Sequence, residues 1–144
     1  VLIDSISVIR YTKKFLTKEK FYKRINFFGI DFFKEIPNFD YDIVLLSKIL
    51  HDWDDNKCIK LLRNISKVMK LRGTLIIHEE IITNDNSPNF WPAILDLFLF
   101  TVMGNAKTRT KKEIEFLLTL TGFKMKKIEK INEYTSIIIA TKIN

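Results

Sequence analysis

Hydrophobic residues follow two patterns along the chain: continuous apolar runs, and runs with helical spacing. Continuous runs predict strands, and the long run at 41–50 is typical of a strand buried on both faces of a parallel sheet. Apolar residues spaced three and four positions apart predict helices. We therefore expect strands at 1–3, 24–28, 41–50, 74–82, 123–131 and 134–141, and helices at 5–16, 54–69, 91–103 and 110–121.

Several connections carry signals of their own. Arg72-Gly73 has the basic residue and glycine that commonly end a helix. Residues 83–92 are rich in turn-forming residues and predict a loop. The helix at 91–103 is apolar nearly all round, so we expect it between layers or under a partner chain. A tight Asn132-Glu133 turn requires the last two strands to be antiparallel.

The order of these elements predicts the fold class. Alternating strands and helices that finish in an antiparallel hairpin indicate an α/β sandwich with a mixed sheet. In such sheets, ligands bind beyond the carboxyl ends of the parallel strands. We therefore expect the functional residues at strand ends.

Two candidate catalytic residues follow neighbouring strands. His51 comes after the buried strand, where an imidazole can act as a general base near neutral pH. Glu79 ends the next strand, and a carboxylate beside an imidazole fixes its tautomer and stabilises the imidazolium. The alternatives are a capping or packed histidine and an acid that faces solvent.

Two further acidic residues are candidates for binding a nucleoside. Asp4 ends the first strand, where an acid commonly accepts hydrogen bonds from ribose hydroxyls. Asp31 lies between Gly29 and Phe32-Phe33, so it can hold an adenine amino group while a ring packs on the base. An ordinary turn aspartate beside core phenylalanines is the alternative. Four such residues at successive strand ends favour a nucleotide-binding enzyme.

Composition and charge exclude or disfavour several other classes of protein. Cys58 is the one cysteine, which excludes an internal disulfide framework and a multi-cysteine zinc site and favours a reducing, cytoplasmic compartment. No apolar run reaches the ~18 residues of a membrane span. The net charge is +7, but the lysines are dispersed and not interleaved with aromatic residues. This dispersal disfavours a nucleic-acid-binding module.

The segment from Asp42 to Asp55, which includes His51-Asp52-Trp53, resembles the signature segment of the S-adenosylmethionine-dependent O-methyltransferases of the caffeic-acid and hydroxyindole type. Other segments resemble that family in the same order, over essentially the whole chain: 1–4, 29–33, 72–79, 107–110 and 121–123. The resemblance implies a Rossmann-like class I methyltransferase fold.

The resemblance also implies a reaction. His51 would take the proton from a hydroxyl of a small aromatic acceptor, Glu79 would orient His51, and the methyl group would come from S-adenosylmethionine without a metal. The cofactor would be held by four residues: Asp4 at the ribose, Asp31 and Phe32 at the adenine, and Ser47, which stands where the family often has a lysine. Family members of full length imply a homodimer.

Two departures leave a second hypothesis open. Thr108 stands where the family has a glutamate flanking the histidine, and a hydroxyl brings no negative charge to raise the pKa of the base. The family's glycine-rich loop and first strand precede the strand at 1–3, and its dimerisation domain precedes both. We therefore expect residues 1–144 to be a partial catalytic domain with unpaired strand edges. The alternative is an inactive fragment or a non-methylating relative that binds a ligand or partner.

Overall fold

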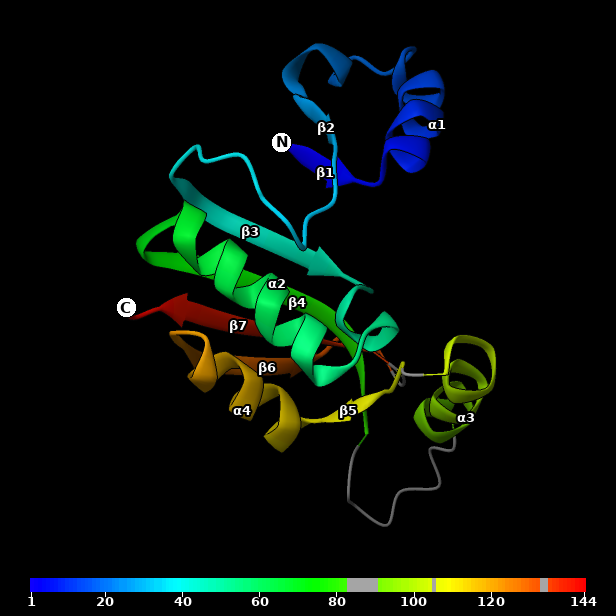
Figure 1. Ribbon diagram of the computed structural model, residues 1–144, viewed down its shortest axis with the longest axis vertical. Helices are drawn as coiled ribbons and strands as arrows, with labels where there is room; N and C mark the ends of the chain where they lie inside the picture. The colour runs from blue at the N-terminus through cyan, green and yellow to red at the C-terminus, as the bar shows by residue number, and fades with distance from the viewer. Residues whose placement is uncertain (83–90, 105, 133–134) are drawn as a thin grey trace. The chain divides into compact units, whose positions relative to one another are not determined.

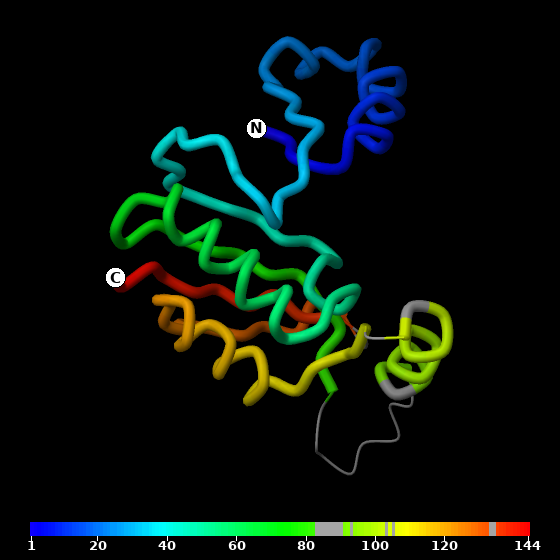
Figure 2. The backbone as a smooth tube through the Cα atoms, in the orientation of Figure 1, coloured from blue at the N-terminus to red at the C-terminus, as the bar shows by residue number. Residues whose placement is uncertain are grey.

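The computed structural model describes residues 1–82, 91–104, 106–132 and 135–144. They form two compact units, residues 1–37 and 38–144, and each is described by itself (Figure 1). The backbone trace of each unit can be followed in Figure 2. Most of the predicted loop at 83–92 and part of the predicted turn at 132–133 lie outside the described residues.

The first unit is a parallel pair of strands joined through a helix. Its elements are β1 (Leu2–Asp4), α1 (Ile6–Leu16), the 3₁₀ turn η1 (Tyr22–Arg24) and β2 (Phe27–Gly29). Asp4 pairs with Gly29, so β1 and β2 end at the same edge. Ser5 caps α1 by accepting a hydrogen bond from the Val8 N–H at 3.5 Å.

One strand of this unit is shorter than predicted. The expected strand at 24–28 begins only at Phe27, because residues 22–24 form the η1 turn. Gly29 ends β2 where α1 approaches closely. A Cβ at Gly29 would lie 2.9 Å from the Ile6 Cα, so only glycine permits this packing without a shift.

The second unit is a mixed sheet covered by helices. Its strands are β3 (Tyr41–Ser47), β4 (Met69–Ile82), β5 (Arg109–Thr110), β6 (Phe123–Lys130) and β7 (Thr135–Lys142), in the order β3-β4-β7-β6 with β5 paired to β4. β3 and β5 run parallel to β4, whereas β7 is antiparallel to both β4 and β6. The predicted α/β fold, with a mixed sheet that ends in an antiparallel hairpin, is confirmed.

The core of this unit lies between the sheet and two helices. α2 (Asp55–Val68) and α4 (Lys111–Leu120) cover the same face of the sheet (Figure 1). The buried side chains alternate along β4, as expected for a strand that faces helices on one side. Leu62, Leu75, Ile77, Leu118 and Ile138 are 0% exposed and fill this layer.

The prediction that Arg72-Gly73 ends a helix is wrong. α2 ends at Val68, and both residues lie inside β4. Arg72 has a φ of 65°, and a Cβ on Gly73 would lie 2.9 Å from the Lys70 carbonyl oxygen of β4 itself and 3.2 Å from the Asp42 carbonyl oxygen of β3. The register between β3 and β4 shifts at this point. The glycine therefore permits a tight bend within β4 beside β3, not a helix cap.

The strand predicted at 41–50 differs in length and in burial. β3 ends at Ser47, and the 3₁₀ turn η2 (Leu50–Asp52) follows. Within its unit β3 is the end strand, with Ile43 and Leu45 62% and 60% exposed. Burial on both faces was therefore a wrong prediction.

α3 (Trp91–Met103) packs on β4 and η2 along one side only. Leu99 is buried, whereas Leu97 and Phe100 are each 65% exposed, so the expectation of a helix buried between layers is not met within this chain. Among the described residues, no helix is long and apolar enough to span a membrane.

Candidate active site

The turn that carries His51 leaves the sheet with unusual backbone geometry. Lys48, directly after β3, has a φ of 57°, in the left-handed region that non-glycine residues rarely adopt. Its N–H donates to the His78 carbonyl of β4 at 3.0 Å, which continues the pairing one residue past the end of β3. The η2 turn then directs the side chain of His51 toward β4.

His51 and Glu79 meet as the sequence predicts. The Nδ1 atom of His51 lies 2.5 Å from the Oε2 atom of Glu79, which is 2% exposed. The other carboxylate oxygen accepts the Ile49 and Leu50 N–H groups at 3.0 and 2.8 Å. Because an ionised carboxylate only accepts hydrogen bonds, Nδ1 carries the proton and Nε2 is left as the basic atom. The pair therefore has the geometry of an oriented general base.

The surroundings of His51 raise its pKa. Burial alone would lower it, but the hydrogen bond and negative charge of Glu79, with the charges of Asp52 and Glu80, raise the pKa above its ordinary 6.5. Asp52 lies 3.3 Å from Nε2, and burial raises the pKa of this carboxyl group. The site therefore stabilises the imidazolium that forms when His51 accepts a proton.

Asp52 was not predicted as a site residue. Its position next to His51 in the His-Asp-Trp motif was the available signal, but the sequence did not show which side of the ring it would face.

Other charged groups around the dyad are paired. Glu80 forms an ion pair with Lys48, and a small cavity behind the dyad is lined in part by Lys107 and Arg109. His51, Glu79 and Glu80 offer ligand atoms within 4.8 Å of one another. Glu79 has N–H partners and the Oε1 atom of Glu80 has a cationic one, whereas the buried Oε2 atom of Glu80 has no hydrogen-bond partner among the described residues. We assign no metal to the cluster.

Among the residues that the structure describes, the hydrogen bonds of Ser47 and Thr108 join residues other than His51. The Ser47 hydroxyl lies 3.0 Å from Nδ1 of His78, on the strand that also carries Glu79. Thr108 is buried, and its N–H donates to Asp96 at 2.6 Å. Within the described part of the chain, the Thr108 hydroxyl has no hydrogen-bond partner.

The predicted cofactor residues Asp4, Asp31 and Phe32 belong to the first unit. Asp4 follows β1 and accepts the Ser5 N–H at 2.7 Å, and Asp31, just beyond β2, accepts the Phe33 N–H at 3.0 Å. In each case one carboxylate oxygen is held by the backbone. The Oδ2 atom of Asp4 has no hydrogen bond from any residue that the structure describes. Two oriented carboxylates at neighbouring strand ends fit the hydroxyl and amino groups of a nucleoside.

The aromatic rings beside Asp31 lie close together. The Phe32 and Phe33 ring centroids are 4.8 Å apart. The structure thus brings Asp4 and Asp31 to adjacent strand ends in one unit, and His51 and Glu79 into contact in the other.

Comparisons with known proteins show the family to which the chain belongs. The model of a family described as an O-methyltransferase domain matches residues 1–124. A phenazine O-methyltransferase from Lysobacter antibioticus is 34% identical over 143 residues, which are 99% of this chain and 41% of that protein. A flavonoid 4'-O-methyltransferase from Mentha piperita is 33% identical over 119 residues, 81% of this chain and 34% of that protein.

A solved structure extends the likeness to the fold and the cofactor. The crystal structure of human N-acetylserotonin methyltransferase in complex with S-adenosylmethionine aligns with a TM-score of 0.84 and 27% identity, over 99% of this chain and 40% of that one. The chain thus spans less than half the length of each relative. The expected resemblance and the expected cofactor of the family are both confirmed. This chain belongs to the O-methyltransferase family, whose members depend on S-adenosylmethionine.

Proposed function

We propose that this chain contributes the catalytic base and a nucleoside-binding edge to an O-methyltransferase that acts on a hydroxyl of a small aromatic molecule. The observation that carries the proposal is the 2.5 Å contact between His51 Nδ1 and the buried Glu79 carboxylate. The relatives named for phenazine, flavonoid and acetylserotonin substrates support an aromatic acceptor. This proposal is better supported than a non-methylating relative, because the base and its orienting acid are both present.

In the proposed mechanism, His51 accepts the hydroxyl proton of the acceptor at Nε2. Glu79 keeps the other ring proton on Nδ1 and, together with Asp52, stabilises the resulting positive charge. When bound, S-adenosylmethionine supplies a methyl group made electrophilic by a positively charged sulfur. The protein then has to position and deprotonate the acceptor, which a buried and oriented imidazole can do.

The cofactor residues in this proposal are those predicted from the sequence. Asp4 would hold the ribose hydroxyls, Asp31 and Phe32 the adenine, and Ser47 another part of the cofactor. Two observations support these roles: the Oδ2 atom of Asp4 has no hydrogen-bond partner among the described residues, and β1 and β2 end at the same edge of the first unit.

The proposal also concerns the longer protein, its oligomeric state and its compartment. We infer that residues 1–144 are part of the catalytic domain of a longer enzyme, since the matched relatives are more than twice as long. The exposed apolar side chains of α3, including Leu97 and Phe100, support a homodimer of that enzyme. The free, buried thiol of Cys58 is compatible with a reducing, cytoplasmic compartment.

His51→Ala in the full-length protein tests the proposal. Methyl transfer to a catechol, a flavonoid and N-acetylserotonin would be followed by mass spectrometry. Turnover should fall about 10²- to 10⁴-fold, because general-base catalysis typically contributes this much. Cofactor affinity, measured by calorimetry, should stay within about threefold, because His51 does not bind the nucleoside. Lys60→Ala, at an exposed position of α2, is the control. Unchanged turnover in His51→Ala would refute the proposal.

A further inference from the structure

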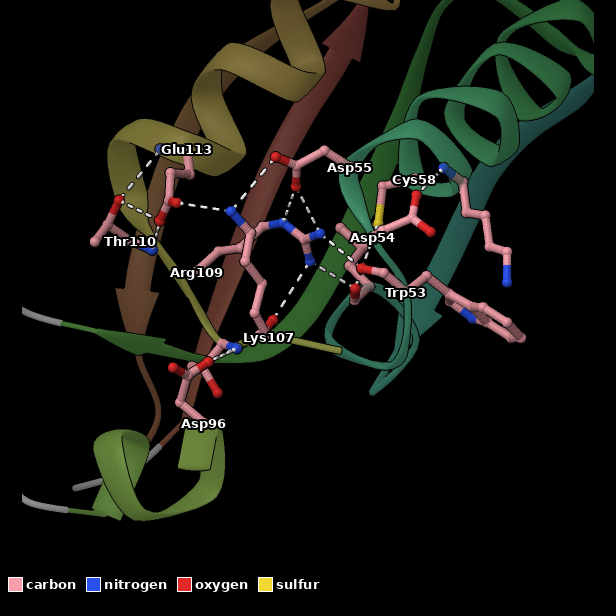
Figure 3. A network of polar contacts seen from close by, with 12 residues as sticks. Trp53, Asp54, Asp55, Cys58, Asp96, Lys107, Arg109, Thr110 and Glu113 are labelled. Carbon is pink, nitrogen blue, oxygen red and sulfur yellow. Dashed lines mark hydrogen bonds and ion pairs between the residues drawn. The ribbon is translucent and has the colours of Figure 1, made fainter. Parts of the chain in front are cut away.

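A buried arginine lies directly behind the turn that carries His51. Arg109 is 2% exposed and stands in β5 (Figure 3). A guanidinium group has five N–H donors in a fixed planar arrangement. In Arg109 all of them are used, since Nε donates to Asp55, Nη1 to the Leu50 and Lys107 carbonyls, and Nη2 to Asp55 and the Trp53 carbonyl.

Two of these acceptors flank the proposed base in sequence. Arg109 donates to the Leu50 carbonyl at 2.6 Å and to the Trp53 carbonyl at 2.7 Å, so it binds the backbone on both sides of His51. The His51 carbonyl itself accepts the Lys107 N–H at 3.0 Å. The segment 107–109 therefore holds three carbonyl groups of the turn at once.

The opposite side of the same turn is held by Glu79. Its carboxylate accepts the Ile49 and Leu50 N–H groups and contacts the imidazole. Leu50 is thus fixed at both ends of its backbone, by Glu79 at the N–H and by Arg109 at the C=O. A turn held from both sides leaves the attached imidazole little freedom to leave Glu79.

The charge of Arg109 is balanced where it is buried. Its Nη2 atom lies 2.8 Å from the Asp55 carboxylate, at the first residue of α2. Burial alone would raise the pKa of Asp55, but the hydrogen bonds and charge of Arg109, with the charge of Lys107, lower it below its usual range. Asp55 is therefore ionised at neutral pH, and the buried guanidinium has the partner that it requires.

A second donor acts on the same carbonyl groups. The Cys58 thiol lies 3.3 Å from the Leu50 carbonyl oxygen and 3.5 Å from that of Trp53. Burial raises the pKa of this thiol to about 11, so it remains a neutral donor. The N-terminal part of α2 thus supports the turn beside Arg109.

From this geometry we infer that Arg109, anchored by Asp55, is a positioning residue that holds the His51 turn in the orientation needed for the contact between His51 and Glu79. The expected effect of Arg109 on turnover rests on the proposed function, whereas its expected effect on the orientation of the His51 ring does not. Small displacements of a catalytic group are costly, and about 1 Å can reduce a rate 10²-fold.

The test uses the two histidines of the chain as reporters. Ring ¹⁵N spectra are recorded on the full-length protein, and the variants His51→Gln and His78→Gln assign the signals of these two residues. In Arg109→Lys the charge remains, but the fork that bridges Leu50 and Trp53 is lost. We expect the titration midpoint of His51 to fall toward its ordinary 6.5, by about half a pH unit, as contact with Glu79 loosens. The low-field signal of the Nδ1 proton should weaken in parallel.

Arg63→Lys is the matched control, because Arg63 is exposed on α2. It should leave both readouts unchanged. If Arg109→Lys does not fold by circular dichroism, Asp55→Asn takes its place, since it removes only the charge of a side chain that is 52% exposed and keeps an amide oxygen that can accept from Arg109. It should move the His51 midpoint in the same direction by a smaller amount. A folded Arg109→Lys or Asp55→Asn chain whose His51 signals match those of Arg63→Lys would overturn the inference.

Activity separates this inference from the proposed function. In the full-length protein, Arg109→Lys should lower kcat about tenfold, while the KM for S-adenosylmethionine changes less than about twofold. If His51→Ala leaves turnover intact, the proposed function fails, yet the ring spectra still decide whether Arg109 positions His51. If His51 proves catalytic and the Arg109→Lys spectra are unchanged, only the positioning role is refuted.

Discussion

Replacing Glu79 with glutamine tests the proposed dyad most directly, because it keeps the shape of the side chain and removes its charge. In the native protein one carboxylate oxygen accepts the Ile49 and Leu50 N–H groups. In Glu79→Gln these two donors select the amide oxygen and leave the amide NH₂ facing Nδ1 of His51. A donor at this position requires Nδ1 to accept, so the ring proton moves to Nε2. The neutral imidazole then has no basic atom toward the acceptor.

The size of the effect on His51 follows from the contact that is lost. A hydrogen bond to a charged group contributes about 1.5–3 kcal/mol, and 1.36 kcal/mol corresponds to one pH unit. The pKa of His51 should therefore fall by about 1–2 pH units. In the variant, burial still lowers this pKa and only the charges of Asp52 and Glu80 oppose it, so His51 should titrate well below its midpoint in the native protein. Turnover should fall about 10²- to 10⁴-fold, with cofactor affinity nearly unchanged.

Two measurements examine this reasoning. Ring ¹⁵N titration of the full-length protein reports the pKa and the tautomer of His51, and methyl-transfer assays of the same protein report turnover. Glu115→Gln, at an exposed position of α4, is the control for the same chemical change. A Glu79→Gln chain in which His51 titrates as in the native protein, with its proton still on Nδ1, would refute the role of Glu79.

Two other predictions concern the pH dependence of turnover and the proposed ribose-binding residue Asp4. Only the neutral imidazole of His51 can accept a proton, and the three acids Glu79, Asp52 and Glu80 raise its pKa. The value of kcat/KM should therefore rise with pH through a midpoint above 6.5 and then level off. A profile that stays flat from about pH 6 to pH 9 would contradict a histidine base. Asp4→Asn should weaken S-adenosylmethionine binding by the full-length protein about tenfold or more, measured by calorimetry, because it loses charge-assisted hydrogen bonds to the ribose. Equal affinity in Asp4→Asn and in the exposed control Glu19→Gln would argue against the ribose role.

The contact between His51 and Glu79 could be predicted because it depends on topology. The carboxyl ends of neighbouring parallel strands meet at one edge of a sheet, so two residues that follow such strands are brought together. β3 and β4 are paired in parallel up to Ser47 and His78, one residue before Glu79. The same rule placed Asp4 and Asp31 at adjacent strand ends.

The support by Arg109 could not be predicted in this way. Its bond to the Leu50 carbonyl joins residues 59 positions apart, through a strand of two residues that has no hydrophobic pattern of its own. Residues 107–110 resemble a segment of the family, but this resemblance indicated no role for Arg109.

The errors in the fold have a similar origin. Glycine after a basic residue suits both a helix end and a close approach of two strands. Apolar side chains alone also do not reveal whether a neighbouring layer covers them, as Ile43 and Leu45 show.

The long separation between the parts of the proposed site bears on how the protein folds. His51 contacts an acid 28 positions later and its turn is tied to an arginine still further along, so neither contact exists in a locally formed helix or hairpin. Contacts of this kind require the closure of long loops, so a partly folded chain that holds only local structure lacks them. An imidazole that titrates above its ordinary range would thus mark molecules that have completed folding, whereas partly folded chains would contain a histidine like that of a free peptide.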